Sequence, residues 1–172
     1  VAVGFRSLAS TTTADNNTAI GACSLNANTT GTKNTAVGMS SLIANTEGSQ
    51  NVSLGSCSML ANTTGSNNTA IGHIALCANT TGSCNVAIGR DSLDSNTTGS
   101  SNVAVGTDTL QANSTGGSNI AIGDDALKGN STASFNIGIG ATALQANQTG
   151  TGNVAIGYQS LTTSTASNNT AV

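Results

Sequence analysis

The sequence predicts an all-β protein, a parallel β-solenoid (β-roll) built from about ten coils of 17 residues each. The first observation is a phrase, Asn-x-small-Ile/Val/Leu-Gly, that recurs at a fixed step of 17 residues along the chain. The second is that apolar, Gly and Asn residues keep the same positions in every copy. Fixed-period similarity in this size range is typical of solenoids and repeat arrays. The copies start at Asn17, Asn34, Asn51, Asn68, Asn85, Asn102, Asn119, Asn136 and Asn153.

Composition narrows the function classes. Only 6% of the 172 residues are charged and 2% are aromatic, and the chain has no Pro. Disordered chains are usually rich in charge and Pro, so the composition does not favour disorder. Four Lys and Arg residues and a net charge of −3 make nucleic-acid binding a poor prediction. No apolar run approaches membrane-spanning length, so we expect no membrane insertion.

The repeat array occupies residues 1–172 as a single domain. The chain opens inside one copy, at Val1–Gly4, and closes inside another, at Asn169–Val172. We therefore expect it to be a fragment of a longer fibre, and the lack of a signal peptide gives no information about secretion.

Each copy is numbered here from its Asn as position 1. Positions 2 to 4 are β-branched or small, which predicts a short strand. The invariant Gly at position 5 indicates a sharp bend or a positive φ. Positions 7 to 10 contain a Leu and are expected to form a second short strand. Positions 12 to 15 read Asn-Thr-Thr-Gly or a close variant, which is turn chemistry.

Two aliphatic columns are predicted to point inward and form the core. The column at position 4 is Ile20, Val37, Leu54, Ile71, Ile88, Val105, Ile122, Ile139 and Ile156. The column at position 9 is Leu25, Leu42, Met59, Leu76, Leu93, Leu110, Leu127, Leu144 and Leu161. We expect the position 1 Asn residues to form an inward or turn-capping ladder that bonds coil to coil. A coil this thin would leave the Thr, Val and Ile side chains of position 2 exposed unless a second chain covers them, which favours self-association.

The Asn-x-Ala-Ile/Val-Gly phrase followed by a Ser/Ala-Leu step, as in Asn85–Gly89 and Ser92-Leu93, resembles the head repeats of trimeric autotransporter adhesins. It is also similar to repeats of phage and large-virus fibre proteins. The resemblance covers essentially the whole chain and implies a left-handed parallel β-roll, three chains around one axis and a role in surface attachment. Two features differ. The adhesin repeat is shorter, near 14 residues, and the adhesin neck and coiled-coil stalk have no counterpart here, so a single-chain fibril stays open.

Asn-x-Thr/Ser triplets give the most numerous candidates for modification. At position 12 they are Asn28, Asn62, Asn79, Asn96, Asn113, Asn130 and Asn147, and others start at Asn16, Asn67 and Asn168. In a secretory pathway, N-glycans on an exposed loop would coat one edge of the rod. The alternative is that Asn-Thr-Thr-Gly serves only as a turn. The Thr ladders also raise ice binding as a further alternative, although the Thr pair lies on a Gly-bounded loop.

The remaining reactive residues form no recognisable catalytic set. Asp91, Asp108 and Asp125 share position 7 in three successive coils, which suggests either a cation such as Ca²⁺ or three solvated surface acids; the second is favoured. The cysteines Cys23, Cys57, Cys77 and Cys84 lack metal-ligand spacing, and one interchain or adjacent-coil bridge stays open. His73 stands alone. We predict no enzyme activity, no cofactor and no metal.

The sequence thus predicts a structural and adhesive fibre shaft, located outside the cell on a cell or virion surface. Its expected partners are other copies of the chain, as a homotrimer or fibril, and a host-surface or glycan receptor. The alternatives are a single-chain N-glycosylated extracellular fibril and an ice-binding solenoid.

Overall fold

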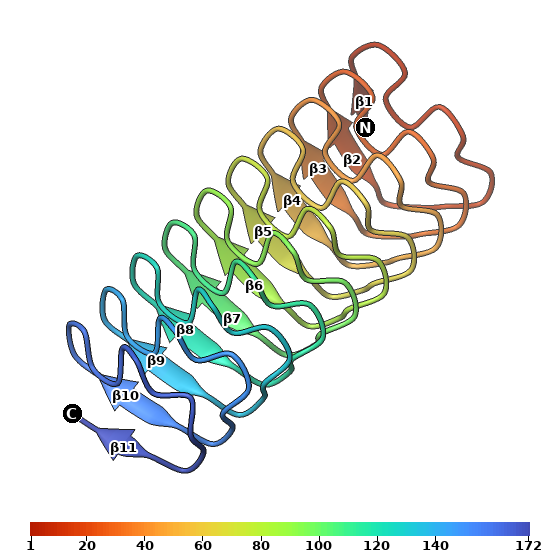
Figure 1. The fold of residues 1–172 in the computed structure, drawn as a ribbon. Helices are drawn as coiled ribbons and strands as arrows, with labels where there is room; N and C mark the ends of the chain where they lie inside the picture. The colour runs from red at the N-terminus through yellow and green to blue at the C-terminus, as the bar shows by residue number, and fades with distance from the viewer.

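A computed structural model describes all 172 residues as a straight stack of coils, with the two termini at opposite ends (Figure 1). Eleven short strands form one parallel sheet along one side of the rod, in chain order, and there are no helices. The prediction of an all-β parallel solenoid of about ten coils is confirmed. The strands are β1 (Ala2–Val3), β2 (Thr18–Ile20), β3 (Thr35–Val37), β4 (Val52–Leu54), β5 (Thr69–Ile71), β6 (Val86–Ile88), β7 (Val103–Val105), β8 (Ile120–Ile122), β9 (Ile137–Ile139), β10 (Val154–Ile156) and β11 (Thr170–Ala171).

The 17-residue step sets the register of the sheet. Val86 of β6 pairs with Val103 of β7, and every other internal pair likewise joins equivalent positions. Only the last coil is one residue shorter, so that Val154 pairs with Thr170. Equivalent residues therefore stack directly on one another, and the backbone outside the strands also bonds from coil to coil, as when the Leu93 N–H donates to the Thr109 carbonyl at 3.0 Å.

Position 5 must be Gly for two reasons, and the expected positive φ is confirmed there. Gly89 has φ = 134°, a region that side chains disfavour. A Cβ on Gly89 would also lie 2.2 Å from the carbonyl oxygen of Gly106 in the next coil. The bend thus allows successive coils to stack at the distance the sheet requires.

The second strand expected at positions 7 to 10 is wrong. These residues form a turn in which positions 7 and 9 both take left-handed backbone conformations, with φ = 55° at Asp91 and 51° at Leu93. Such conformations are costly for non-Gly residues and persist only where the surroundings impose them. Here the turn directs the Leu side chain into the interior, where it is fully buried.

The core has one of the two predicted aliphatic columns. The position 9 residues from Leu25 to Leu144 are fully buried, and Leu161 packs against them partly buried. The inward assignment of position 4 is wrong, because these side chains lie on the outer face of the sheet. Ile20 is 41% exposed and Ile88 36%. Since side chains alternate across a strand, the small residue at position 3 points inward instead, as does fully buried Ala87.

The position 4 residues of the other coils show the same outward placement. Ile71, Ile122 and Ile156 are exposed, and Val37, Leu54, Val105 and Ile139 are half-buried. The physical reason is space: the Leu of position 9 fills the narrow interior, so that only Ala, Ser or Gly fits opposite it at position 3.

Candidate functional site

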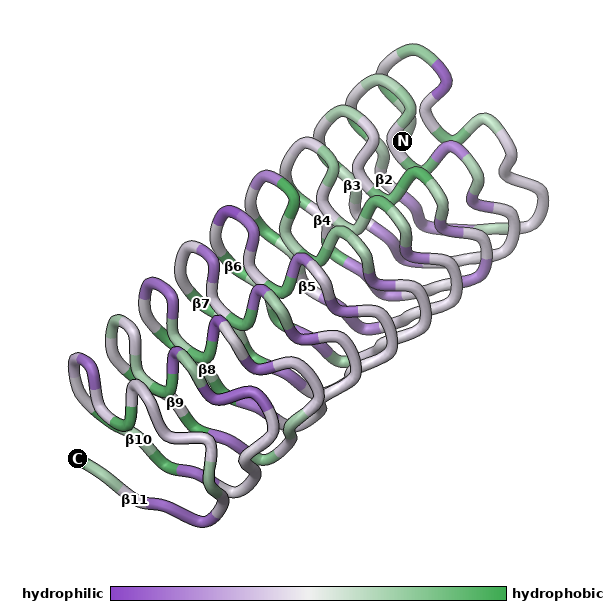
Figure 2. Tube along the Cα trace, viewed as in Figure 1, coloured by the Kyte–Doolittle hydropathy of each residue, from purple (hydrophilic) through white to green (hydrophobic).

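Three surfaces and two internal ladders repeat along the rod. The first surface is the outer face of the sheet, formed by the side chains of positions 2 and 4. It carries two columns of mostly Val and Ile, with Thr at position 2 in β2, β3 and β5. Figure 2 shows hydrophobic residues recurring in the strands coil after coil. Ile120 at position 2 is 36% exposed and Ile122 at position 4 is 39% exposed. Contiguous apolar surface of this kind is typical of interaction sites.

The position 1 Asn ladder lies inside the rod, and the prediction that it bonds coil to coil is confirmed. Asn85 Oδ1 accepts from the backbone N–H of Asn102 at 3.0 Å, while Asn85 Nδ2 donates to the Gly99 carbonyl at 2.9 Å. Each side chain therefore links its own coil to the next, with no polar atom left facing the core.

A second Asn ladder, at position 12, was not predicted. Asn96 Nδ2 donates to Asn79 Oδ1 at 2.8 Å and to the Gly99 carbonyl at 3.0 Å, and Asn96 Oδ1 accepts from Asn113 Nδ2 at 2.9 Å. The same pattern extends over eight coils, and every member is fully buried. Its members are Asn28, Asn45, Asn62, Asn79, Asn96, Asn113, Asn130 and Asn147.

The burial of this ladder conflicts with the predicted glycosylation at position 12. The Nδ2 atom that would carry a glycan is buried and donates its hydrogens inside the rod, as in Asn62 and Asn79. The loop is exposed at position 14, but the Asn of position 12 points into the interior of the coil. Of the other acceptor triplets, those of Asn16, Asn67 and Asn168 start at exposed residues, each of which directly precedes a position 1 Asn.

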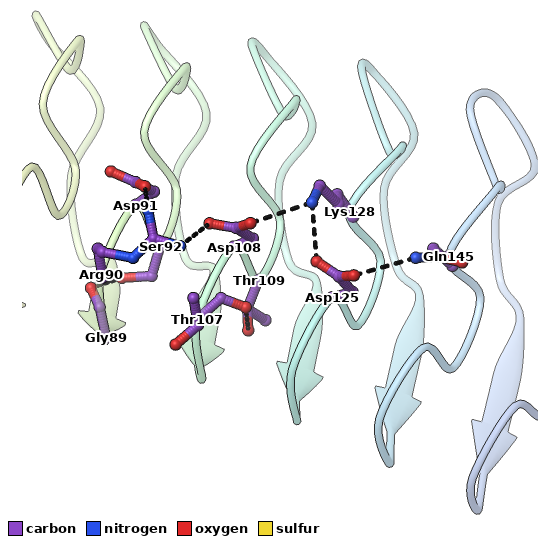
Figure 3. Close-up of polar contacts among 10 residues, drawn as sticks. All are labelled: Gly89, Arg90, Asp91, Ser92, Thr107, Asp108, Thr109, Asp125, Lys128 and Gln145. Atoms are coloured by element: carbon purple, nitrogen blue, oxygen red, sulfur yellow. Dashed lines mark hydrogen bonds and ion pairs between the residues drawn. The ribbon is translucent and has the colours of Figure 1, made fainter.

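The second surface is the turn face, formed by the side chains of positions 6, 7 and 10. It carries a ladder of charged side chains that crosses successive coils (Figure 3). Arg90 pairs with Asp91 and, at 3.5 Å, with Asp108. Lys128 bridges Asp108 at 3.0 Å and Asp125 at 2.8 Å. Two of the protein's own cations thus pair with the three stacked carboxylates and offset most of their charge. This arrangement favours partly solvated surface acids, the interpretation preferred over a Ca²⁺ site.

Two pKa values on this face are displaced from their usual range. Hydrogen bonds to Asp125 and Asp108 raise the pKa of Lys128, because they stabilise its charged form. Partial burial and the neighbouring Asp91 carboxylate raise the pKa of Asp94. Asp94 therefore lies where both burial and a neighbouring negative charge disfavour its ionised form.

The third surface is a double column of hydroxyl groups at positions 14 and 16. Position 14 is exposed in each coil, and the Ser of position 16 is half-buried and bonds to the neighbouring coil. Ser83 N–H donates to Ser100 Oγ at 3.0 Å, which holds the column in register. The exposed column consists of Thr30, Thr64, Thr81, Thr98, Thr115, Thr132 and Thr149, with Glu47 replacing Thr in one coil.

The other candidate residues are not brought together into a catalytic arrangement. His73 is exposed on the rod surface, and all four Cys residues have free thiols. The molecule has no pocket and no group of three or more His, Cys, Asp or Glu placed to hold a metal ion. It also contains no helix of the length and hydrophobicity needed to cross a membrane.

Comparison of the chain with protein families, with curated proteins and with solved structures gives no match. Functional argument therefore depends on the surfaces themselves. Of these, the outer sheet face is the one whose chemistry most clearly calls for a partner, because its position 4 column is apolar along the whole rod.

Proposed function

We propose that this chain is the shaft of a structural and adhesive extracellular fibre, displayed on a cell or virion surface, in which three copies of a left-handed β-roll pack around one axis as a homotrimer. The observation that carries the proposal is the outer face of the sheet, where position 4 is Val, Ile or Leu from β2 to β10 and position 2 is also Val or Ile from β6 to β10. Burying this face between copies removes exposed Ile and Val side chains from water, which favours association.

The repeating geometry supports a fibre over a compact oligomer. Strands about 4.8 Å apart and about 10 Å long give roughly 50 Å² of flat face per coil. About ten coils therefore give roughly 500 Å², less than the roughly 800 Å² that each partner of a standard stable interface buries, so association strengthens with each coil that is added. Adhesion would then use the exposed positions of the coils, which recur along the rod and give many weak contacts to a host-surface or glycan receptor.

The test is the mass of the native assembly, measured by native mass spectrometry. The unmodified chain is expected to give the mass of three chains. Ile88→Lys combined with Ile122→Lys places charges on the outer face and is expected to give monomers. The control, Thr98→Lys with Thr132→Lys, places the same charges on the exposed hydroxyl column and is expected to keep the trimer. A monomeric unmodified chain would overturn the trimer and favour a single-chain fibril.

Ice binding is a second candidate because of the exposed Thr column. Seven Thr residues of position 14 repeat at the coil spacing beside the Ser-rich column of position 16. Their loops are held in register by backbone bonds, as when the Thr80 N–H donates to the Thr97 carbonyl at 2.9 Å. Thermal hysteresis that is lost when Thr81 and Thr98 are both replaced by Lys would support this function. A lack of hysteresis in the unmodified chain would exclude it.

A further inference from the structure

Position 7 of each coil lies beside position 10 of the next coil, 20 residues later. Two pairs show this directly: Lys128 Nζ lies 3.0 Å from Asp108 Oδ2, and Gln145 Nε2 donates to Asp125 Oδ2 at 3.2 Å. A third contact shows that the backbones are near each other as well. The short side chain of Asn26 reaches the carbonyl oxygen of Arg6, at 2.9 Å from Nδ2.

Cys57 and Cys77 have this same relation. Cys57 occupies position 7 of the coil 51–67, and Cys77 occupies position 10 of the coil 68–84. Both residues are half-buried with free thiols. The Ala61 N–H donates to the Cys77 carbonyl at 2.9 Å, which fixes the second turn against the first. No other position 7 and position 10 pair in the chain consists of two cysteines.

The pKa of Cys77 also reflects the position of Cys57 beside it. Burial is the main cause that raises this pKa, followed by the negative charges of Asp94 and Cys57. A thiolate at Cys57 disfavours ionisation of Cys77 only if the two groups are near each other. Asp94 lies at position 10 of the next coil, so it occupies the same column as Cys77.

We propose that Cys57 and Cys77 are a disulfide site that staples two neighbouring coils within one chain. The oxidant is a small-molecule disulfide, such as oxidised glutathione. One protein thiolate attacks it, forms a mixed disulfide and releases one small thiol. The second protein thiol loses its proton, attacks the mixed disulfide and releases the second small thiol. The protein loses two protons and two electrons, and the external disulfide takes them up to become two thiols.

The other two cysteines provide the internal comparison. Cys23 occupies position 7, like Cys57, but lies two coils away, at a distance of about 9.6 Å from strand spacing alone. Disulfide geometry requires Cα atoms within about 7 Å, so these two residues are too far apart. Cys84 is exposed at position 17, outside the turn face. The staple lies inside one chain, so it does not depend on trimer formation or on the proposed function.

The test uses two variants with two thiols each, equilibrated in a buffer of reduced and oxidised glutathione. Cys23→Ser with Cys84→Ser keeps the proposed pair. Cys77→Ser with Cys84→Ser keeps Cys23 and Cys57 as the matched control. Free thiols are then alkylated, and the proteins are digested and mapped by mass spectrometry.

The expected result is a linked peptide containing Cys57 and Cys77, at least tenfold more abundant than any internal link in the control. In the unmodified chain, the same linked peptide is expected while Cys23 and Cys84 remain alkylated or form glutathione adducts. Free thiols at both Cys57 and Cys77, separate glutathione adducts on each, or links only between different chains would each overturn the proposal. A circular dichroism spectrum like that of the unmodified chain establishes that the variants are folded.

Discussion

The most direct test of how the rod is held together is the replacement of one member of the position 12 ladder, Asn96→Ala. The side chain of Asn96 makes three hydrogen bonds: to Asn79, to Asn113 and to the carbonyl of Gly99. All three are buried. The variant therefore removes one rung from the middle of a continuous ladder without touching the sheet.

The magnitude follows from the groups left without partners. Asn79 Oδ1 loses its only donor, and Asn113 Nδ2 loses one of its two acceptors. The Gly99 carbonyl keeps its second donor, Asn85 Nδ2, at 2.9 Å. A buried group left unsatisfied costs about 1–3 kcal/mol, so two such groups predict a loss of about 2–6 kcal/mol. That is a large share of the total stability of a typical domain, about 5–15 kcal/mol.

The assay is urea unfolding followed by circular dichroism, with Thr98→Ala as the control in the same coil. Thr98 is exposed, so its replacement is expected to change the free energy of unfolding by less than about 0.5 kcal/mol. Because both residues lie in one coil, any dependence of unfolding on position along the rod affects both variants equally. A loss below about 1 kcal/mol for Asn96→Ala would show that the ladder does not hold the coils together as argued.

The variant Asn96→Asp keeps a side chain of the same size but removes its hydrogen-bond donor, so it separates the loss of hydrogen bonds from the loss of the side chain. A carboxylate at this buried site cannot donate to Asn79 Oδ1, whereas a protonated carboxyl can. Burial raises the pKa of the new carboxyl in the folded state above its value in the unfolded chain. The folded state then binds more protons, so stability is highest at low pH and falls as the pH rises through the folded-state pKa. Stability of this variant that does not change, relative to the unmodified chain, between pH 4 and pH 8 would contradict this account.

Three other changes test the core, the bend and the charged face. Leu93→Ala is expected to lower the free energy of unfolding by about 2–5 kcal/mol, since the side chain is fully buried. Ile88→Ala is expected to lower it by clearly less, because Ile88 is 36% exposed. Both variants are measured by urea unfolding of the monomer. Gly89→Ala introduces both a steric clash and a residue with an unfavourable φ, whereas Gly157→Ala introduces only the unfavourable φ of 124°, because its Cβ would meet no neighbour. The melting temperature is therefore expected to fall further for Gly89→Ala. Equal decreases in melting temperature would refute the clash. Lys128→Ala is expected to cost no more than about 1 kcal/mol, with the difference vanishing in high salt. Because hydrogen bonding raises the pKa of Lys128, its contribution is present at neutral pH and is lost as the pH rises through that folded-state pKa, which a pH series of melting curves would detect.

The sequence predicted the coil, its repeat length, the strand at positions 2 to 4, the Gly bend and the position 9 column, because each depends on residue types that tolerate few alternatives. Which face of the strand points inward could not be predicted in the same way. In three residues with alternating faces, either position 3 or positions 2 and 4 together can point inward. The prediction placed the large position 4 side chains inward and those of position 2 outward, which alternation across a strand does not allow. The width of the interior decides which face of the strand points inward. The position 9 side chains, such as Leu93, limit this width, because a turn with left-handed backbone conformations directs them into the interior. No local pattern shows that turn, since Leu rarely takes this conformation.

The same limit explains the position 12 Asn. Asn-Thr-Thr-Gly is equally compatible with an exposed turn and with a buried ladder, and the choice depends on whether stacked Asn side chains can bond one another. A signal was present in the sequence. Asn45 keeps its place at position 12 although the following Thr46-Glu47 gives no glycosylation triplet, which fits a role for the Asn itself. Only the alignment of all coils separates the two interpretations.

The interior and the outer surface of the rod differ in chemistry, because large and small residues occupy fixed positions in each coil. Inside the rod, the Ala and Leu side chains pack together, and two columns of Asn side chains form hydrogen bonds from coil to coil. Each coil therefore depends mainly on its two neighbours. Outside, the sheet presents Val and Ile that no part of the chain covers. The residues that differ from coil to coil lie at turn positions such as 7 and 10, where one coil carries Cys57 and another carries Asp108. Substitutions there leave the ladders intact, so specific contacts and staples can be added to individual coils while the stack itself stays the same.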